Sequence, residues 1–258
     1  MLAALFAVGC SKGGGGEKKV ASQAPVAAPA ATVSDAAPAA RKKKKPPLPP
    51  PPTKAARRDF RGRMKQGRDL AKHGQYARAA AEFELLSTHR SSPITDLLRA
   101  LARQLHQRAG GPGVGAVGMC LTGNFALSLM LEPCLLAPVP SQPSLPFGVT
   151  ASRRRALHLS PAELRVVRRR ARDEGVGVLA LRFTADVMCP RARFDSLRRE
   201  LGPGVETIEI DSHPGNAHGI PRVAHSVLTN DLVDRDGHPT RAALDRVMAF
   251  LDERLHAD

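Results

Sequence analysis

A cysteine, an aspartate and a histidine occur in the chain order that suits thiol-based hydrolysis. Cys120 lies among small residues in the run Gly118-Met-Cys-Leu-Thr-Gly123. Asp186 follows the apolar residues 178–183, and His218 lies in a later loop. A thiolate attacks an ester carbonyl when an adjacent imidazole takes its proton and a carboxylate orients that imidazole. The pattern therefore predicts Cys120 as nucleophile, His218 as base and Asp186 as the residue that orients the histidine.

Each of these residues follows a predicted strand. Residues 114–119 form a short buried strand that turns directly into a helix, which is the setting of a nucleophile elbow. Asp186 comes after a strand that ends at residue 183, and His218 comes after the strand 205–210. In folds with such an elbow, the acid and the histidine follow the nucleophile on the loops after later strands. The order along the chain therefore favours a triad at one edge of a parallel sheet.

The cysteine motif differs from the strict elbow pattern G-x-S-x-G. Thr122 occupies the second small position, and Gly123 comes one residue later. An inert buried cysteine is the alternative interpretation of Cys120, because cysteine is a frequent core residue. If the elbow forms, the backbone N–H of Leu121, the residue after the nucleophile, is expected to be one oxyanion donor.

Asp186 and the histidines also have ordinary interpretations. Taken singly, Asp186 suits a turn or capping residue, and His218 suits a loop histidine. His213 and His225 are weaker candidates for the base, because neither lies in a comparable glycine-flanked loop. The prediction of a triad depends on the residues occurring together, in order, after successive strands.

Four segments of the chain resemble the dienelactone hydrolase family. They are Gly118-Met-Cys-Leu-Thr-Gly-Asn-Phe-Ala-Leu127, Ser141-Gln-Pro-Ser-Leu-Pro146, Leu181-Arg-Phe-Thr-Ala-Asp186 and Pro214-Gly-Asn-Ala-His-Gly-Ile-Pro-Arg-Val-Ala-His-Ser-Val-Leu228. The resemblance covers residues 93 to 255. It implies an α/β-hydrolase domain that opens a small cyclic or activated ester with a Cys-Asp-His triad, here Cys120, Asp186 and His218. It implies no cofactor.

From residue 93 onward, strands alternate with helices, which predicts an α/β domain with a parallel sheet. Strands are expected at 114–119, 135–139, 176–183 and 205–210, and helices at 94–108, 122–131, 161–174, 191–201 and 239–255. The resembled family has further strands before the nucleophile strand. We therefore expect an incomplete α/β-hydrolase sheet with flanking helices over residues 93–258. Its nucleophile strand would be an exposed edge, and self-association is the expected result.

The first ten residues resemble a lipoprotein leader. Residues 2–9 are apolar and end in a small residue directly before Cys10. This pattern predicts lipidation of Cys10 and a bacterial membrane-anchored lipoprotein, and the alternative is a meaningless apolar start on a cytoplasmic protein. The Ala/Pro/Lys-rich residues 11–56 are expected to form a disordered tether.

Residues 57–92 read as a helical hairpin that resembles a single tetratricopeptide repeat. The positions that carry the resemblance are Gly67, Leu70, Gly74, Tyr76, Ala79, Phe83 and Leu86. A plain amphipathic hairpin fits equally well. Together with the leader, the hairpin supports a second hypothesis, in which the protein is a non-catalytic, membrane-tethered protein with a degenerate hydrolase fold and a helical interaction module.

The net charge of +15 does not indicate nucleic-acid binding. Every lysine lies between Lys12 and Lys72, in a low-complexity segment with few aromatic residues, whereas the rest of the chain uses arginine. The four cysteines include no CxxC pair and have no partner histidines at zinc spacing, so we expect no metal site. A small ester or lactone substrate is the partner that the sequence favours.

Overall fold

The computed structural model describes residues 4–8, 62, 65–66, 69–70, 72–75 and 93–256. The predictions for Cys10, for the tether at 11–56 and for most of the hairpin at 57–92 lie outside these residues. Among the described residues, no helix is both long and apolar enough to cross a membrane.

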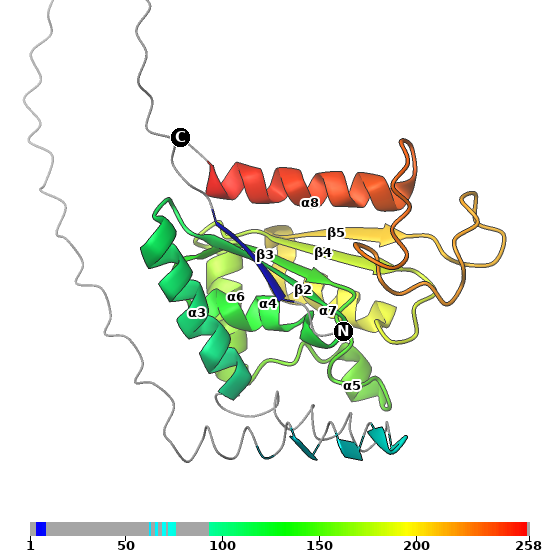
Figure 1. Ribbon diagram of the computed structural model, residues 1–258, viewed down its shortest axis with the longest axis horizontal. Coiled ribbons are helices and arrows are strands. Elements are labelled where there is room, and N and C mark those ends of the chain that lie inside the picture. The colour runs from blue at the N-terminus through cyan, green and yellow to red at the C-terminus, as the bar shows by residue number, and fades with distance from the viewer. Residues whose placement is uncertain are drawn as a thin grey trace, which may run out of the picture. The chain divides into compact units, whose positions relative to one another are not determined.

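A five-stranded sheet lies at the centre of the described domain (Figure 1). Its strands follow one another across the sheet in chain order: β1 (Ala4–Val8), β2 (Val114–Met119), β3 (Leu135–Ser141), β4 (Val178–Phe183) and β5 (Val205–Ile210). Strands β2 to β5 pair in parallel, which confirms the prediction of an α/β domain. All six residues of β4 are buried, as expected for a parallel strand that is covered on both faces.

Strand β1 pairs with the outer edge of β2 in the antiparallel direction. The register places Ala4 opposite Gly118 and Val8 opposite Val114. The prediction of a bare nucleophile strand is therefore wrong, because residues 4–8 provide β2 with a neighbour. The sequence pattern assigns these same residues to a leader before Cys10. A short apolar run suits an edge strand equally well, and periodicity alone does not separate the two.

Helices cover both faces of the sheet (Figure 1). One face carries α3 (Pro93–Ala109), α4 (Phe125–Ser128), α6 (Pro161–Arg172) and α7 (Arg191–Leu201), and their apolar residues share one buried cluster. The other face carries α8 (Pro239–Leu255), whose Val247 and Phe250 are buried with Phe183 of β4 in a second cluster. The short helix α5 (Ala151–Arg155) packs against α7. The sheet is thus the middle of three layers.

Helix α6 shows how local sequence fixes the elements. Ser160 accepts the N–H of Glu163 with its hydroxyl, and the Glu163 carboxylate accepts the N–H of Ser160. Pro161 occupies the first helical position, where its missing N–H costs nothing. These contacts satisfy backbone donors that would otherwise lack a partner at the start of the helix.

One predicted helix differs in the structure. The residues expected at 122–131 form the 3-10 turn η1 (Cys120–Thr122), the single turn α4 and the 3-10 turn η2 (Leu129–Leu131). The segment between β2 and β3 is short, and Pro133 disfavours a helical conformation at the residue before it. From residue 93 onward, the other predicted helices and strands match the structure to within two residues at each end.

Candidate active site

Cys120 lies on a sharp turn at the carboxyl end of β2. Its backbone φ angle is 54°, a left-handed conformation that non-glycine residues rarely adopt. A Cβ on Gly118 would lie 2.3 Å from the carbonyl oxygen of Thr122, and a Cβ on Gly123 would lie 2.4 Å from Pro143 Cα. Glycine is therefore required at both positions. The second glycine, one residue later than in the strict motif, faces the loop that follows β3.

Asp186 is buried in the turn that follows β4. Its Oδ1 accepts the backbone N–H groups of Met188 at 2.9 Å and Cys189 at 3.2 Å. Its Oδ2 lies 2.7 Å from Nδ1 of His225. The carboxylate therefore caps its own turn and also orients a histidine.

The loop between β5 and α8 supplies this histidine. Backbone N–H groups of His225 and Ser226 donate to Oδ2 of Asp231 at 2.9 and 2.7 Å. One carboxylate within the loop thus fixes the backbone at the histidine. The His225 side chain is 18% exposed, so solvent reaches the ring while the Asp186 carboxylate behind it is buried. An imidazole in this position can exchange protons with a bound substrate or with water.

Ser144 lies between the histidine and the cysteine. Its Oγ is 3.4 Å from His225 Nε2 and 3.7 Å from Cys120 Sγ. The result is a chain of contacts from Asp186 through the imidazole and the Ser144 hydroxyl to the sulfur. Sequence reasoning did not single out Ser144, and the available signal was its place in a short Pro-rich loop after the strand next to β2.

The electrostatics of the pair favour a thiolate beside an imidazolium. Burial raises the pKa of the Cys120 thiol, but hydrogen bonds with His225 and Ser144 and the charge of His225 outweigh burial and lower it below its ordinary value. Burial lowers the pKa of His225, but hydrogen bonds to Asp186 and Cys120 raise it to about 10. By contrast, burial raises the pKa of Cys134 and of Cys189. Among the cysteines that the structure describes, Cys120 has the surroundings of a reactive thiol.

The predicted base, His218, does not reach this site, and this part of the prediction is corrected. The His218 side chain is exposed, and its ring meets the edge of the His238 ring at a centroid distance of 5.4 Å. His213 instead lies against Asp211 and Thr184. The glycine-flanked loop favoured His218, whereas the fold brings His225, seven positions further on, to Asp186.

Hydrogen bonding by the backbone N–H of Leu121 is the smallest of the influences that lower the pKa of the Cys120 thiol. The role of this N–H in an oxyanion hole stays a prediction.

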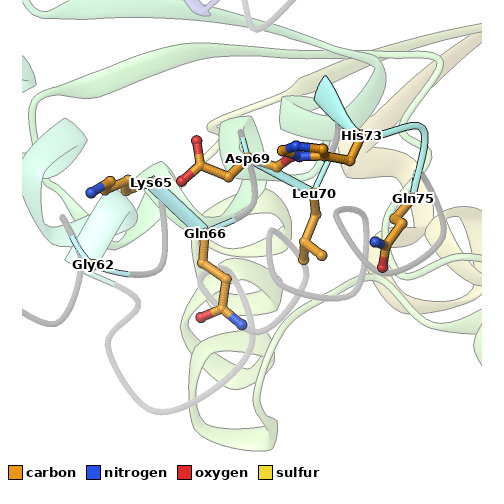
Figure 2. A pocket seen from close by; sticks show the side chains of 7 residues that line it. All are labelled: Gly62, Lys65, Gln66, Asp69, Leu70, His73 and Gln75. Atoms are coloured by element: carbon orange, nitrogen blue, oxygen red, sulfur yellow. The ribbon is translucent and has the colours of Figure 1, made fainter.

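Two cavities are lined by described residues, and neither lining includes Cys120. One of about 350 Å³ is lined by Gly62, Lys65, Gln66, Asp69, Leu70, His73 and Gln75, whose side chains are drawn in Figure 2. The His73 ring there hydrogen-bonds the carbonyl of Asp69, four residues earlier in the chain. The other, of about 500 Å³, lies between β5, the following loop and α8, and includes His218. Within the described ranges, no cluster of His, Cys, Asp or Glu could bind a metal ion.

Searches of this chain against models of known protein families, curated proteins and solved structures find no match.

Proposed function

We propose that the protein hydrolyses small esters or lactones with a Cys120–His225–Asp186 triad. The observation that carries the proposal is the set of contacts that joins the buried Asp186 carboxylate to His225 and, through the Ser144 hydroxyl, to the Cys120 sulfur. These residues come from the ends of β2 and β4 and from the loop after β5. The left-handed elbow supports the proposal, because a strained turn is common where a nucleophile is presented above a sheet.

In the proposed first step, the Cys120 thiolate attacks the ester carbonyl carbon, and a C–S bond forms as the C=O π pair moves onto oxygen. The Leu121 N–H would stabilise that oxygen. When the tetrahedral intermediate collapses, the C–O bond breaks and the leaving oxygen takes the proton from His225 Nε2. The product is a thioester on Cys120. For a lactone, the released hydroxyl stays attached to the acyl group.

In the second step, His225 takes a proton from water as the water oxygen attacks the thioester carbonyl. The C–S bond then breaks, and the carboxylic acid leaves as the thiolate and imidazolium pair is restored. Asp186 orients the ring and balances its charge in both steps. No cofactor is needed, since the substrate and water provide all the atoms that are exchanged.

We further propose that the domain is a reduced α/β-hydrolase of the dienelactone hydrolase type. The support is the resemblance of the four segments and the position of their residues around the site: one includes Cys120, one Ser144, one Asp186 and one His225. In this proposal, β1 takes the place of the early strands that the resembled family would have.

The test is hydrolysis of p-nitrophenyl acetate and of a small lactone by the full chain. Cys120→Ala is expected to lower kcat/KM by about 1,000-fold or more, since no other group forms the thioester. Cys134→Ala is the matched control, because burial raises the pKa of that half-buried thiol and it lies away from the triad. It should retain full activity.

Mass spectrometry of the acid-quenched reaction provides a second readout. We expect an acetyl group on the peptide that contains Cys120, and none on the peptide that contains Cys134. Full activity in Cys120→Ala, or an acetyl group on another residue that forms and decays at the turnover rate, would rule out this nucleophile.

A further inference from the structure

The hydroxyl of Ser144 is placed to contact both reacting groups. Ser144 is fully buried, and its Oγ lies 3.7 Å from Cys120 Sγ, 3.4 Å from His225 Nε2 and 3.2 Å from the Gln142 carbonyl oxygen. A hydroxyl has one donor hydrogen and two acceptor lone pairs. It can therefore accept a hydrogen bond from the protonated Nε2 and donate its one hydrogen either to the Gln142 carbonyl or to the thiolate, and the charged sulfur is the stronger acceptor.

The same hydroxyl also fits the neutral pair. When the sulfur carries the proton and Nε2 does not, the S–H can point to Oγ and the O–H can point to Nε2. Both hydrogen bonds then reverse without movement of a heavy atom. A methyl group in this place would satisfy neither state, and it would leave the buried side of the sulfur without this donor.

Buried side chains fix the loop that carries Ser144. The Ser144 N–H donates to the Cys120 carbonyl at 2.9 Å. The Arg193 guanidinium is fully buried and donates to the carbonyls of Pro143 at 2.6 Å and Pro146 at 2.5 Å, on either side of the serine. The Asn124 side-chain amide donates to the Leu145 carbonyl. The position of Ser144 is thus set by the protein interior and not by solvent.

We propose that Ser144 is a positioning residue. Its hydroxyl fixes the Cys120 sulfur and His225 Nε2 relative to each other, and it stabilises the sulfur in its thiolate form. Its consequence for hydrolysis rests on the proposed function, but its effect on the thiol does not. The experiment therefore measures thiol reactivity, which needs no ester substrate.

The experiment is alkylation of the full chain by iodoacetamide between pH 5 and pH 10, with the rate at Cys120 read from its own peptide by mass spectrometry. Removal of one hydrogen bond to a charged group in Ser144→Ala is expected to raise the midpoint of the pH profile by about one unit. The rate at pH values below both midpoints should fall about tenfold, because the thiolate fraction falls by that factor. Ser128→Ala is the matched control, since Ser128 is also buried but lies in α4.

An unchanged midpoint in a folded Ser144→Ala protein would overturn the proposal. If the alanine variant does not fold, Ser144→Thr and Ser144→Val replace it, because they add equal bulk and only threonine keeps the hydroxyl. The threonine variant should then show the lower midpoint of the two, and equal midpoints would count against Ser144. Absence of ester hydrolysis by the wild-type chain would instead count against the proposed function and leave this result unaffected.

Discussion

Asp186 Oδ2 and His225 Nδ1 lie 2.7 Å apart, although 39 positions separate these residues in the chain. The contact joins the turn after β4 to the loop before α8. Because the other carboxylate oxygen already accepts two backbone N–H groups, the carboxylate has little freedom to turn away from the ring. Under the proposed function, this contact selects His225 over His218 as the histidine that acts with Cys120.

The first prediction distinguishes the two histidines. His225→Ala should abolish ester hydrolysis and raise the pH needed for alkylation of Cys120, because the group that stabilises the thiolate is gone. His218→Ala should change kcat/KM by less than about twofold, since its exposed ring lies against His238 and not against Asp186. Measurement of kcat/KM for the two purified variants shows which histidine is needed for hydrolysis. The reverse outcome would restore His218 as the base.

The second prediction concerns the charge of Asp186. Asp186→Asn keeps an oxygen for the N–H groups of Met188 and Cys189 but removes the negative charge beside His225. The pKa of His225, about 10 in the wild type, should fall, so the imidazolium would lose its proton at a lower pH. Hydrolysis should drop by about 100-fold or more. NMR titration of the His225 ring measures the change in its pKa. An unchanged His225 pKa in Asp186→Asn would contradict the prediction.

The third prediction concerns Glu209, which pairs with the buried Arg182 and with Arg198. Burial raises the Glu209 pKa, but hydrogen bonds from both arginines lower it below its usual 4.5. A carboxyl with a lowered folded-state pKa stabilises the fold above its unfolded pKa, and this contribution is lost as the pH falls through the folded value. Glu209→Gln should therefore cost about 2 kcal/mol of unfolding free energy at pH 7 and progressively less below pH 4.5.

Urea unfolding at pH 7 and at pH 3.5 measures this difference. Glu206→Gln is the control, because the pair of Glu206 with Arg246 lies on the surface and contributes far less. A loss of stability in Glu209→Gln that is equal at both pH values would show that the charge of Glu209 is not the cause.

The fourth prediction concerns the strand at the edge of β2. Deletion of residues 1–11 uncovers the backbone donors and acceptors that face β1, so the shortened protein should self-associate more than the full chain. Replacement of residues 4–8 by glycine and serine is the control for chain length and should act like the deletion. Light scattering after size-exclusion chromatography reports the mass. A monomeric deletion variant with an unchanged unfolding transition would show that β2 needs no such partner.

The fifth prediction concerns lipidation at Cys10. Cleavage before Cys10 would remove residues 4–8, so lipidation and the pairing of β1 exclude each other in one molecule. If the leader functions in a bacterial host, metabolic labelling with a fatty acid should mark the wild type and not Cys10→Ala. Mass spectrometry of the mature N-terminus then identifies which chains keep β1. Unlabelled chains that begin at Met1 would argue against the leader.

Local patterns sufficed for the elements on which the site is built. The strand that ends at Met119, the strand before Asp186 and the helices α7 and α8 were predictable because each has its own periodicity or boundary residues. The position of His225 was not, because 28 residues of loop separate β5 from α8 and no periodicity describes their path. Only the bond to Asp186 and the Asp231 contacts within the loop select one histidine.

The partner of β2 was equally hard to predict. Residues 4–8 lie more than a hundred positions before their neighbours in the sheet. A short apolar run does not indicate which strand it will pair with. The burial of several arginines was also not predictable from the sequence, because arginine is mostly an exposed residue in folded proteins. Arg193 and Arg170 each donate to several loop carbonyls in the interior, and only the fold reveals those acceptors.

The buried arginines bear on the absence of lysine after Lys72, and this absence affects how the protein can be chemically labelled. A guanidinium can donate in several fixed directions at once, so Arg170 and Arg193 could not be exchanged for lysine without loss of carbonyl contacts. Because residues 93–258 contain no lysine, they offer no side-chain amine to reagents that acylate amines. Amine-directed dyes, cross-linkers or surface supports would find their lysines between Lys12 and Lys72, and the proposed reactivity of Cys120 toward activated esters requires that its thiol be reversibly blocked during the coupling. The protein therefore has a built-in attachment segment for single-molecule or immobilised assays.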